Sequence, residues 1–253
     1  MTATRPQTIV LLHALSLTST MWQAQAEALR AEGHHVLTPD QRGFAATPLG
    51  DDPPSLNAAA DDLARLLDAT GHPQAVLAGC SLGAYTAMTF LARHPGRTLA
   101  LALISARATA DTPETRAQRR QFAQLIQDPD ARAAVIDRTT PMLLGPTTRT
   151  RHPDLLAHTL TQAHAADPAA LAWTQAAIAD RADATATLAA THVPALVLHG
   201  AEDALVTAAE SAHTAAALPD GHLITLPATG HLPPLEAPDA VTHHLRALVE
   251  RIP

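Results

Sequence analysis

The chain has 253 residues, of which 47% are hydrophobic and 16% charged, a composition typical of a globular protein built on one large domain. Its 17 basic residues are all arginines and are outnumbered by 24 acidic residues, giving a formal charge of −7, so we expect no face that binds nucleic acid or an anionic membrane. A single cysteine excludes an internal disulfide and fits a reducing compartment.

The N-terminal stretch MTATRPQTIVLLH, residues 1–13, contains an apolar run of four residues. A run of this length is too short for a signal peptide or a membrane span. We therefore expect a cytoplasmic protein without a membrane partner.

Short apolar runs alternate with longer amphipathic stretches along the chain. The runs lack the polar alternation of half-exposed strands, as expected of strands covered on both faces of a parallel sheet, and lie at 8–12, 35–37, 75–79, 99–104, 195–200 and 222–226. Helical patterns lie between them, at 20–32, 56–70, 82–94, 208–218 and 238–250. This alternation predicts an α/β fold, a doubly wound and mostly parallel sheet of about six strands.

One connection is far longer than the others. About ninety residues separate the run at 99–104 from the run at 195–200, whereas a crossover needs roughly 10 to 12. The intervening segment has helical patterns interrupted by several prolines. We expect a helical cap (lid) insertion at 107–190 on a core formed by 1–106 and 191–253, with a plain additional helical bundle as the alternative.

The stretch AGCSLGAYTAM, residues 78–88, offers two adjacent nucleophiles at a strand-to-helix turn. A sharp turn of this kind strains its central residue and requires very small neighbours two positions away on either side. Centred on Ser81, those neighbours are both glycines, in a G-x-S-x-G pattern, whereas centred on Cys80 one of them is a leucine. The spacing favours Ser81 as the nucleophile and assigns Cys80 to packing.

A serine hydroxyl needs a base within hydrogen-bond reach and an acid that orients the base. The loop after the run at 195–200 carries Asp203, and His231 follows the last predicted strand. Any one of fifteen histidines is weak evidence, and Asp203 could instead cap the helix predicted at 208–218. The order Ser, Asp, His, with each residue at the carboxyl end of its own strand, nevertheless predicts a catalytic triad.

With these motifs the chain resembles the α/β-hydrolase family. The resemblance covers nearly the whole sequence outside the predicted cap and includes LAGCSLGAYTAM at the turn, PALVLHGAEDALV around the acid and ATGHLPPLEAPDAV around the histidine. It implies that Ser81 is the nucleophile, Asp203 the acid and His231 the base. Some relatives place the acid one strand earlier, where this chain has Ser105, and this departure favours Asp203. Many relatives also carry an extra hairpin before the first strand predicted here, so six strands are expected rather than eight.

An oxyanion hole is the second requirement of this chemistry. The resemblance implies two backbone N–H donors, one from Leu82 after the nucleophile and one from Leu15 after the first strand. The family usually has His-Gly before the second donor, and this chain has His13-Ala14. A positive φ at Ala14 would be strained, so either the geometry of the hole is altered or the replacement is drift in an alanine-rich chain, as at Ala45.

The substrate pocket is less well determined by the sequence. Met142, Leu143 and Trp173 are expected to line an apolar pocket under the cap, although they could equally form the core of the cap. Seven arginines lie between 116 and 151, and one of them could hold a carboxylate of the substrate, with a solvent-exposed role for all as the alternative. Adjacent histidines point apart and form no metal cluster, and no glycine-rich phosphate loop is present, so no metal or cofactor is expected.

These features predict a serine hydrolase that cleaves a small-molecule carboxylic ester or lactone through an acyl-enzyme, with no cofactor and no nucleic-acid partner. The alternatives on the same triad are a thioesterase, a methylesterase and a carbon–carbon bond hydrolase. A non-catalytic ligand-binding protein and a biosynthetic cyclising protein are further alternatives from other classes. The sequence does not determine the oligomeric state.

Overall fold

The computed structural model describes residues 5–252. Residues 1–4, which belong to the N-terminal stretch discussed above, and residue 253 lie outside the described residues. None of the helices in the described range combines the length and the apolar composition that crossing a membrane requires.

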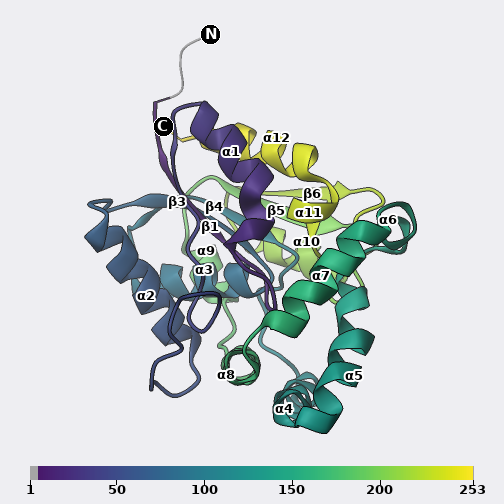
Figure 1. Ribbon diagram of the computed structural model, residues 1–253. Helices are drawn as coiled ribbons and strands as arrows, with labels where there is room; N and C mark the ends of the chain where they lie inside the picture. The colour runs from purple at the N-terminus through teal and green to yellow at the C-terminus, as the bar shows by residue number, and fades with distance from the viewer. Residues whose placement is uncertain (1–4, 253) are drawn as a thin grey trace.

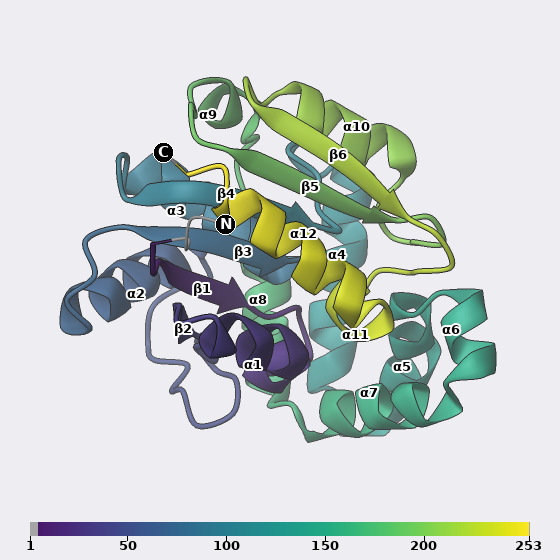
Figure 2. The same ribbon diagram turned by 90° about the horizontal axis from the view of Figure 1, so that it is seen from above.

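Six strands form one sheet in which every neighbouring pair is parallel, in the order β2-β1-β3-β4-β5-β6. Figure 2 shows this order, from β6 at the top to β2 at the bottom. The predicted fold class and the number of strands are confirmed. The strands are β1 (Thr8–Leu12), β2 (His35–Leu37), β3 (Ala75–Cys80), β4 (Thr98–Ile104), β5 (Ala195–Gly200) and β6 (Gly221–Leu226).

Helices cover both faces of the sheet because successive strand residues point to opposite faces. In β1, Ile9 and Leu11 pack into one hydrophobic cluster, whereas Val10 and Leu12 pack into the other. Helices α1 and α12 lie together on the first face, and α2 and α3 lie on the second (Figure 1). The helices of the core are η1 (Ser19–Trp22), α1 (Gln23–Ala31), α2 (Leu56–Ala69), α3 (Leu82–Arg93), α10 (Ala208–Ala216), α11 (Pro233–Glu236) and α12 (Pro238–Val249).

The two edge strands depart from the prediction of burial on both faces. His35 on β2 is exposed, and on β6 only Leu226 is buried, with Leu223 37% exposed. An edge strand has a sheet neighbour on one side only, so its side chains stay partly exposed even where the sequence is apolar.

The long connection between β4 and β5 is helical, as predicted. Proline stands in the first turn of each longer helix, where its missing N–H costs no hydrogen bond. Figure 2 shows α4 to α7 beside the carboxyl ends of the strands. The cap boundaries at 107 and 190 stay a prediction. The elements, here called the insertion helices, are α4 (Pro113–Gln127), α5 (Pro129–Thr139), η2 (Thr140–Leu143), α6 (Pro146–Arg151), α7 (Pro153–Ala165), α8 (Pro168–Ala179) and α9 (Thr185–Ala189).

Candidate active site

Ser81 lies at the turn between β3 and α3 with φ 52° and ψ −109°, a strained backbone conformation for a residue with a side chain. The turn is held by the Ser81 N–H, which donates to the carbonyl of Ile104 on β4 at 2.8 Å. A Cβ on Gly83 would lie 2.1 Å from the Leu12 carbonyl oxygen, and one on Gly79 would lie 2.2 Å from the backbone of Gly83. Only glycine fits at these two positions, so the spacing that selected Ser81 is explained by close backbone approach.

Three predicted site residues meet in one hydrogen-bonded chain. The Ser81 Oγ lies 2.9 Å from Nε2 of His231, and Nδ1 of His231 lies 2.8 Å from Oδ2 of Asp203. Because an ionised carboxylate can only accept, Nδ1 carries the proton and Nε2 is free to accept one from the serine hydroxyl. The three side chains therefore have the arrangement required of nucleophile, base and orienting acid.

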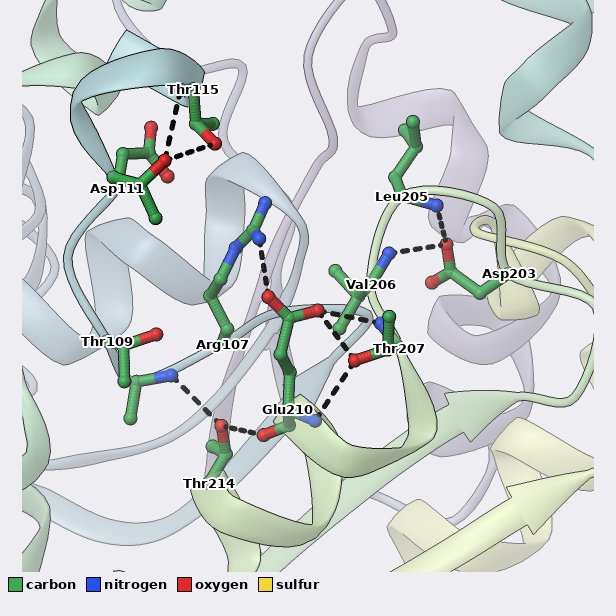
Figure 3. Close-up of polar contacts among 12 residues, drawn as sticks. Arg107, Thr109, Asp111, Thr115, Asp203, Leu205, Val206, Thr207, Glu210 and Thr214 are labelled. Atoms are coloured by element: carbon green, nitrogen blue, oxygen red, sulfur yellow. Dashed lines mark hydrogen bonds and ion pairs between the residues drawn. The ribbon is translucent and has the colours of Figure 1, made fainter.

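The side chain of Asp203 is fully buried, and its carboxylate is fixed by the loop that carries it. Oδ1 accepts the N–H of Leu205 at 2.8 Å and that of Val206 at 3.1 Å, as Figure 3 shows. Burial raises the pKa of Asp203, but His231 and the two amides lower it more, so the net shift is downward and the group stays ionised. The helix that follows is capped by Thr207, so the alternative role of Asp203 as its cap is wrong.

Of the two predicted oxyanion donors, Leu15 lines the same cavity as Ser81, and Leu82 follows Ser81 directly at the start of α3. Neither the Leu15 N–H nor the Leu82 N–H donates to another described residue, and Leu82 is the first residue of α3, at the positive end of the helix. Ala14 does not adopt the positive φ that would strain it, and the left-handed residue of this loop is Ser16, with φ 68°. Ala45, the other replacement noted in the sequence, does have a positive φ, of 50°.

His13 fixes the loop that presents Leu15. Its Nδ1 donates to the Ala14 carbonyl at 2.8 Å, and its Nε2 accepts the Gln41 N–H at 2.8 Å. Burial lowers the pKa of His13, so it is held as the neutral imidazole that these two contacts require. The side chain of Gln41 completes the arrangement by donating to the His13 carbonyl at 2.8 Å.

A cavity of about 630 Å³ lies between Ser81 and the insertion helices. Of the predicted pocket residues, Met142 and Leu143 line it, whereas Trp173 does not. Trp173 is buried elsewhere: its indole N–H donates to the Asp52 carbonyl at 2.8 Å, and the guanidinium of Arg42 lies 5.5 Å from its ring. The expectation that it contacts the substrate is wrong, since α8 turns this side chain towards the 42–52 loop.

Three charged side chains lie in this lining, and all are arginines. They are Arg107, Arg119 and Arg138, and no aspartate or glutamate is among the lining residues. Two of them belong to the seven arginines noted in the sequence, whereas Arg107 follows β4 directly and was not anticipated. Its side chain is held through Glu210 of α10 (Figure 3).

Two carboxylates outside the predicted triad, Glu202 and Glu236, join the loops of Asp203 and His231 to the insertion helices. Glu202 accepts from the N–H and the hydroxyl of Thr147 at 2.9 and 2.5 Å. Glu236 accepts four hydrogen bonds, from the N–H groups of Gly145, Gly230 and Leu232 and from the hydroxyl of Thr148, at 2.7 to 2.9 Å. The His231 N–H also donates to the carbonyl of Leu143, at 3.1 Å.

Cys80 is fully buried under Ser81, in the cluster formed with α1 and α12. Burial raises the pKa of its thiol well above the ordinary range, and the nearby Asp203 and Glu236 raise it further. The side chain is therefore an uncharged packing group, as its spacing indicated. Within the described residues, no three His, Cys, Asp or Glu side chains are grouped as a metal site would need.

Comparison with known proteins gives one family and several close structures. A model described as the alpha/beta hydrolase family matches residues 9–243. A thermophilic esterase from Thermogutta terrifontis, solved with malate bound, is 32% identical with a TM-score of 0.92, covering 97% of this chain and 90% of its own. The enol-lactonase from Burkholderia xenovorans LB400 is 26% identical with a TM-score of 0.87, over 97% of this chain and 92% of its own. The pimeloyl-[acyl-carrier protein] methyl ester esterase of Aromatoleum aromaticum is 31% identical over 91% of this chain and 93% of its own length.

Proposed function

Since the chain belongs to the alpha/beta hydrolase family and is a hydrolase of its ester and lactone type, we propose that it is a serine hydrolase that cleaves a small carboxylic ester or lactone through an acyl-enzyme. The observation that carries the proposal is the continuous chain of contacts from Ser81 through His231 to Asp203. Similarity to an esterase, an enol-lactonase and a methyl ester esterase supports the substrate class.

In the first half-reaction, Nε2 of His231 takes the Ser81 hydroxyl proton as Oγ attacks the carbonyl carbon of the substrate. Asp203 stabilises the imidazolium that forms. The negative charge on the former carbonyl oxygen is stabilised by the amides of Leu15 and Leu82, and loss of one such donor typically costs about 100-fold or more in rate. When the intermediate collapses, His231 gives its proton to the departing alkoxide, leaving the acyl group on Ser81.

In the second half-reaction, water attacks the acyl-enzyme while His231 removes a proton from it. Collapse of this second intermediate breaks the bond to Oγ, returns the proton to Ser81 and releases the acid. With a lactone, the alcohol and the acid are one molecule, so the ring oxygen leaves first but stays attached to the acyl chain.

The test is hydrolysis of 4-nitrophenyl butyrate together with labelling by a fluorophosphonate. Ser81→Ala is expected to lose turnover by about four orders of magnitude or more and to lose the label. Ser105→Ala is the matched control, because Ser105 is also a serine with positive φ at the end of a strand, and its buried hydroxyl makes no hydrogen bond to a described residue. Wild-type turnover by Ser81→Ala, or labelling that persists in it, would contradict the mechanism.

A further inference from the structure

This inference rests on the proposed function of the same site. We propose that the cavity beside Ser81 contains an anion subsite, formed around Arg119 and Arg138, so that the preferred ester or lactone carries a free carboxylate. The subsite lies on the insertion helices α4 and α5, across the cavity from the oxyanion loop.

The first support is the sign of the charge in the cavity. The whole chain carries a formal charge of −7, yet the cavity lining contains three arginines and no carboxylate. The carboxylates that pair with two of these arginines, Asp111 and Glu210, lie outside the lining, so guanidinium donors and no acidic groups face the cavity.

The second support is that Asp111, beside the cavity, contacts two arginines but carries a single negative charge. Its fully buried carboxylate pairs with Arg119 at 2.5 Å and with Arg181 at 2.7 Å. One carboxylate between two guanidinium groups leaves one positive charge uncompensated. Arg119 also donates from Nη1 to the side-chain oxygen of Gln175 at 2.9 Å, a neutral contact that orients the guanidinium but does not remove its charge.

Arg138 supplies a second uncompensated charge at the rim. It is exposed on α5, and no carboxylate of residues 5–252 lies within 4.0 Å of its guanidinium. A guanidinium has five N–H donors in a planar fork that matches a carboxylate. Arg138 is therefore free to bind an anion without breaking an existing ion pair.

Arg107 has a different role from these two. Its Nη1 pairs with Glu210 at 2.5 Å, and Figure 3 shows the other terminal nitrogen pointing away from that carboxylate. Its charge is locally balanced, so it adds hydrogen-bond donors but no net charge. We do not assign the carboxylate to Arg107 for this reason.

Apolar side chains share the cavity with the arginines. Phe122, Leu125, Val135 and Met142 lie in the same lining. A substrate that suits both features has an apolar chain between the scissile carbonyl at Ser81 and a carboxylate at the arginines. Monoesters of unbranched dicarboxylic acids have this form. The chain length that is cleaved best reports the distance between Ser81 and the arginines.

The experiment compares monomethyl adipate, an anion, with dimethyl adipate, its neutral counterpart, by titrating the acid released at low ionic strength. For the wild-type protein we expect kcat/KM to be on the order of 10-fold higher for the monoester, through a lower KM. Arg138→Gln should remove most of this preference, because kcat/KM falls far more for the monoester than for dimethyl adipate. The matched control is Arg120→Gln, an exposed arginine of the insertion helices that lies outside the lining and makes a surface ion pair of little energetic value.

Equal efficiency with the two esters, or a preference that survives in Arg138→Gln, would overturn the anion subsite while leaving the hydrolase proposal intact. A separate binding measurement identifies the opposite case, in which the anion subsite exists but the proposed reaction is wrong. Calorimetric titration of the Ser81→Ala variant with adipate should show binding. Adding Arg138→Gln to that variant should weaken the binding by about the same factor as the loss of preference for the monoester. If this holds but neither ester is cleaved by the wild-type protein, the subsite stands and the proposed reaction is wrong.

Discussion

Replacing Glu236 by glutamine should slow the reaction more than it harms folding. Glu236 accepts the N–H groups of Gly230 and Leu232, which flank His231, and the N–H of Gly145 from the insertion. Glutamine keeps the size of the side chain but has one acceptor oxygen in place of two, and its NH₂ group must face a donor. The substitution therefore disturbs the position of the proposed base without removing any group of the triad.

The magnitude follows from the four hydrogen bonds of this carboxylate. One donor left facing NH₂ costs about 1–3 kcal/mol, and loss of the charge weakens the remaining bonds by a further ~1 kcal/mol. A total of about 3 kcal/mol is less than the roughly 5–15 kcal/mol by which domains are stable, so the protein should stay folded. Displacement of a catalytic group by about 1 Å can cost on the order of 100-fold in rate, and we expect kcat to fall by about 10- to 100-fold with KM little changed.

Steady-state kinetics with 4-nitrophenyl butyrate, combined with urea unfolding, measure the two effects separately. Glu250→Gln is the control, since Glu250 is exposed beyond the end of α12 and its carboxylate makes no hydrogen bond to a described residue. A variant that is destabilised but keeps the wild-type kcat would show that Glu236 holds the fold and does not position His231. A variant with unchanged stability would refute the hydrogen-bond estimate itself.

Four further predictions concern stability and reactivity. Gly145→Ala should lower the free energy of unfolding by about 1–3 kcal/mol in urea titration and also lower kcat, because its Cβ would lie 2.5 Å from Oε2 of Glu202. Ala45→Gly should raise the free energy of unfolding by about 0.5–1 kcal/mol, because an exposed alanine at φ 50° is strained and glycine is not; a lower melting temperature would contradict this. Cys80 should fail to react with Ellman's reagent in the native protein at pH 8 and react fully in denaturant, because burial raises its thiol pKa. Burial lowers the pKa of His13 in the folded state, so the unfolded chain binds more protons in acid; urea titrations should show stability falling as the pH drops below about 6.5, and a rise between pH 6.5 and 5.5 would show the sign to be wrong.

The sheet, the turn at Ser81 and the candidate triad could be predicted because each has a local signal in the sequence. Buried parallel strands give uninterrupted apolar runs, and the turn requires glycine at fixed positions. The helices predicted between the strands were also placed to within three residues of their ends, since their apolar faces repeat with the helical period.

The remaining features depend on contacts between distant residues. The contact between Gly145 and Glu236 joins positions 91 residues apart, and neither the glycine nor the glutamate is unusual in its own segment. Trp173 was placed in the pocket as one of the apolar side chains of the predicted cap, but the direction of a side chain on α8 depends on how that helix packs against its neighbours. Arg107 was missed because only the arginines after residue 116 were considered.

The close contact between Gly145 and Gly230 bears on how this protein could be re-engineered. A Cβ on Gly230 would lie 2.2 Å from the Gly145 amide nitrogen, so the insertion and the histidine loop meet with no room for a side chain. A segment transplanted in place of the insertion helices would have to reproduce Gly145, the hydroxyls of Thr147 and Thr148, and the spacing between these residues. Grafts with both ends between residues 151 and 190 would leave the contact between Gly145 and Gly230 intact. Grafts that replace the 143–148 segment would alter the position of the His231 loop as well as the substrate preference.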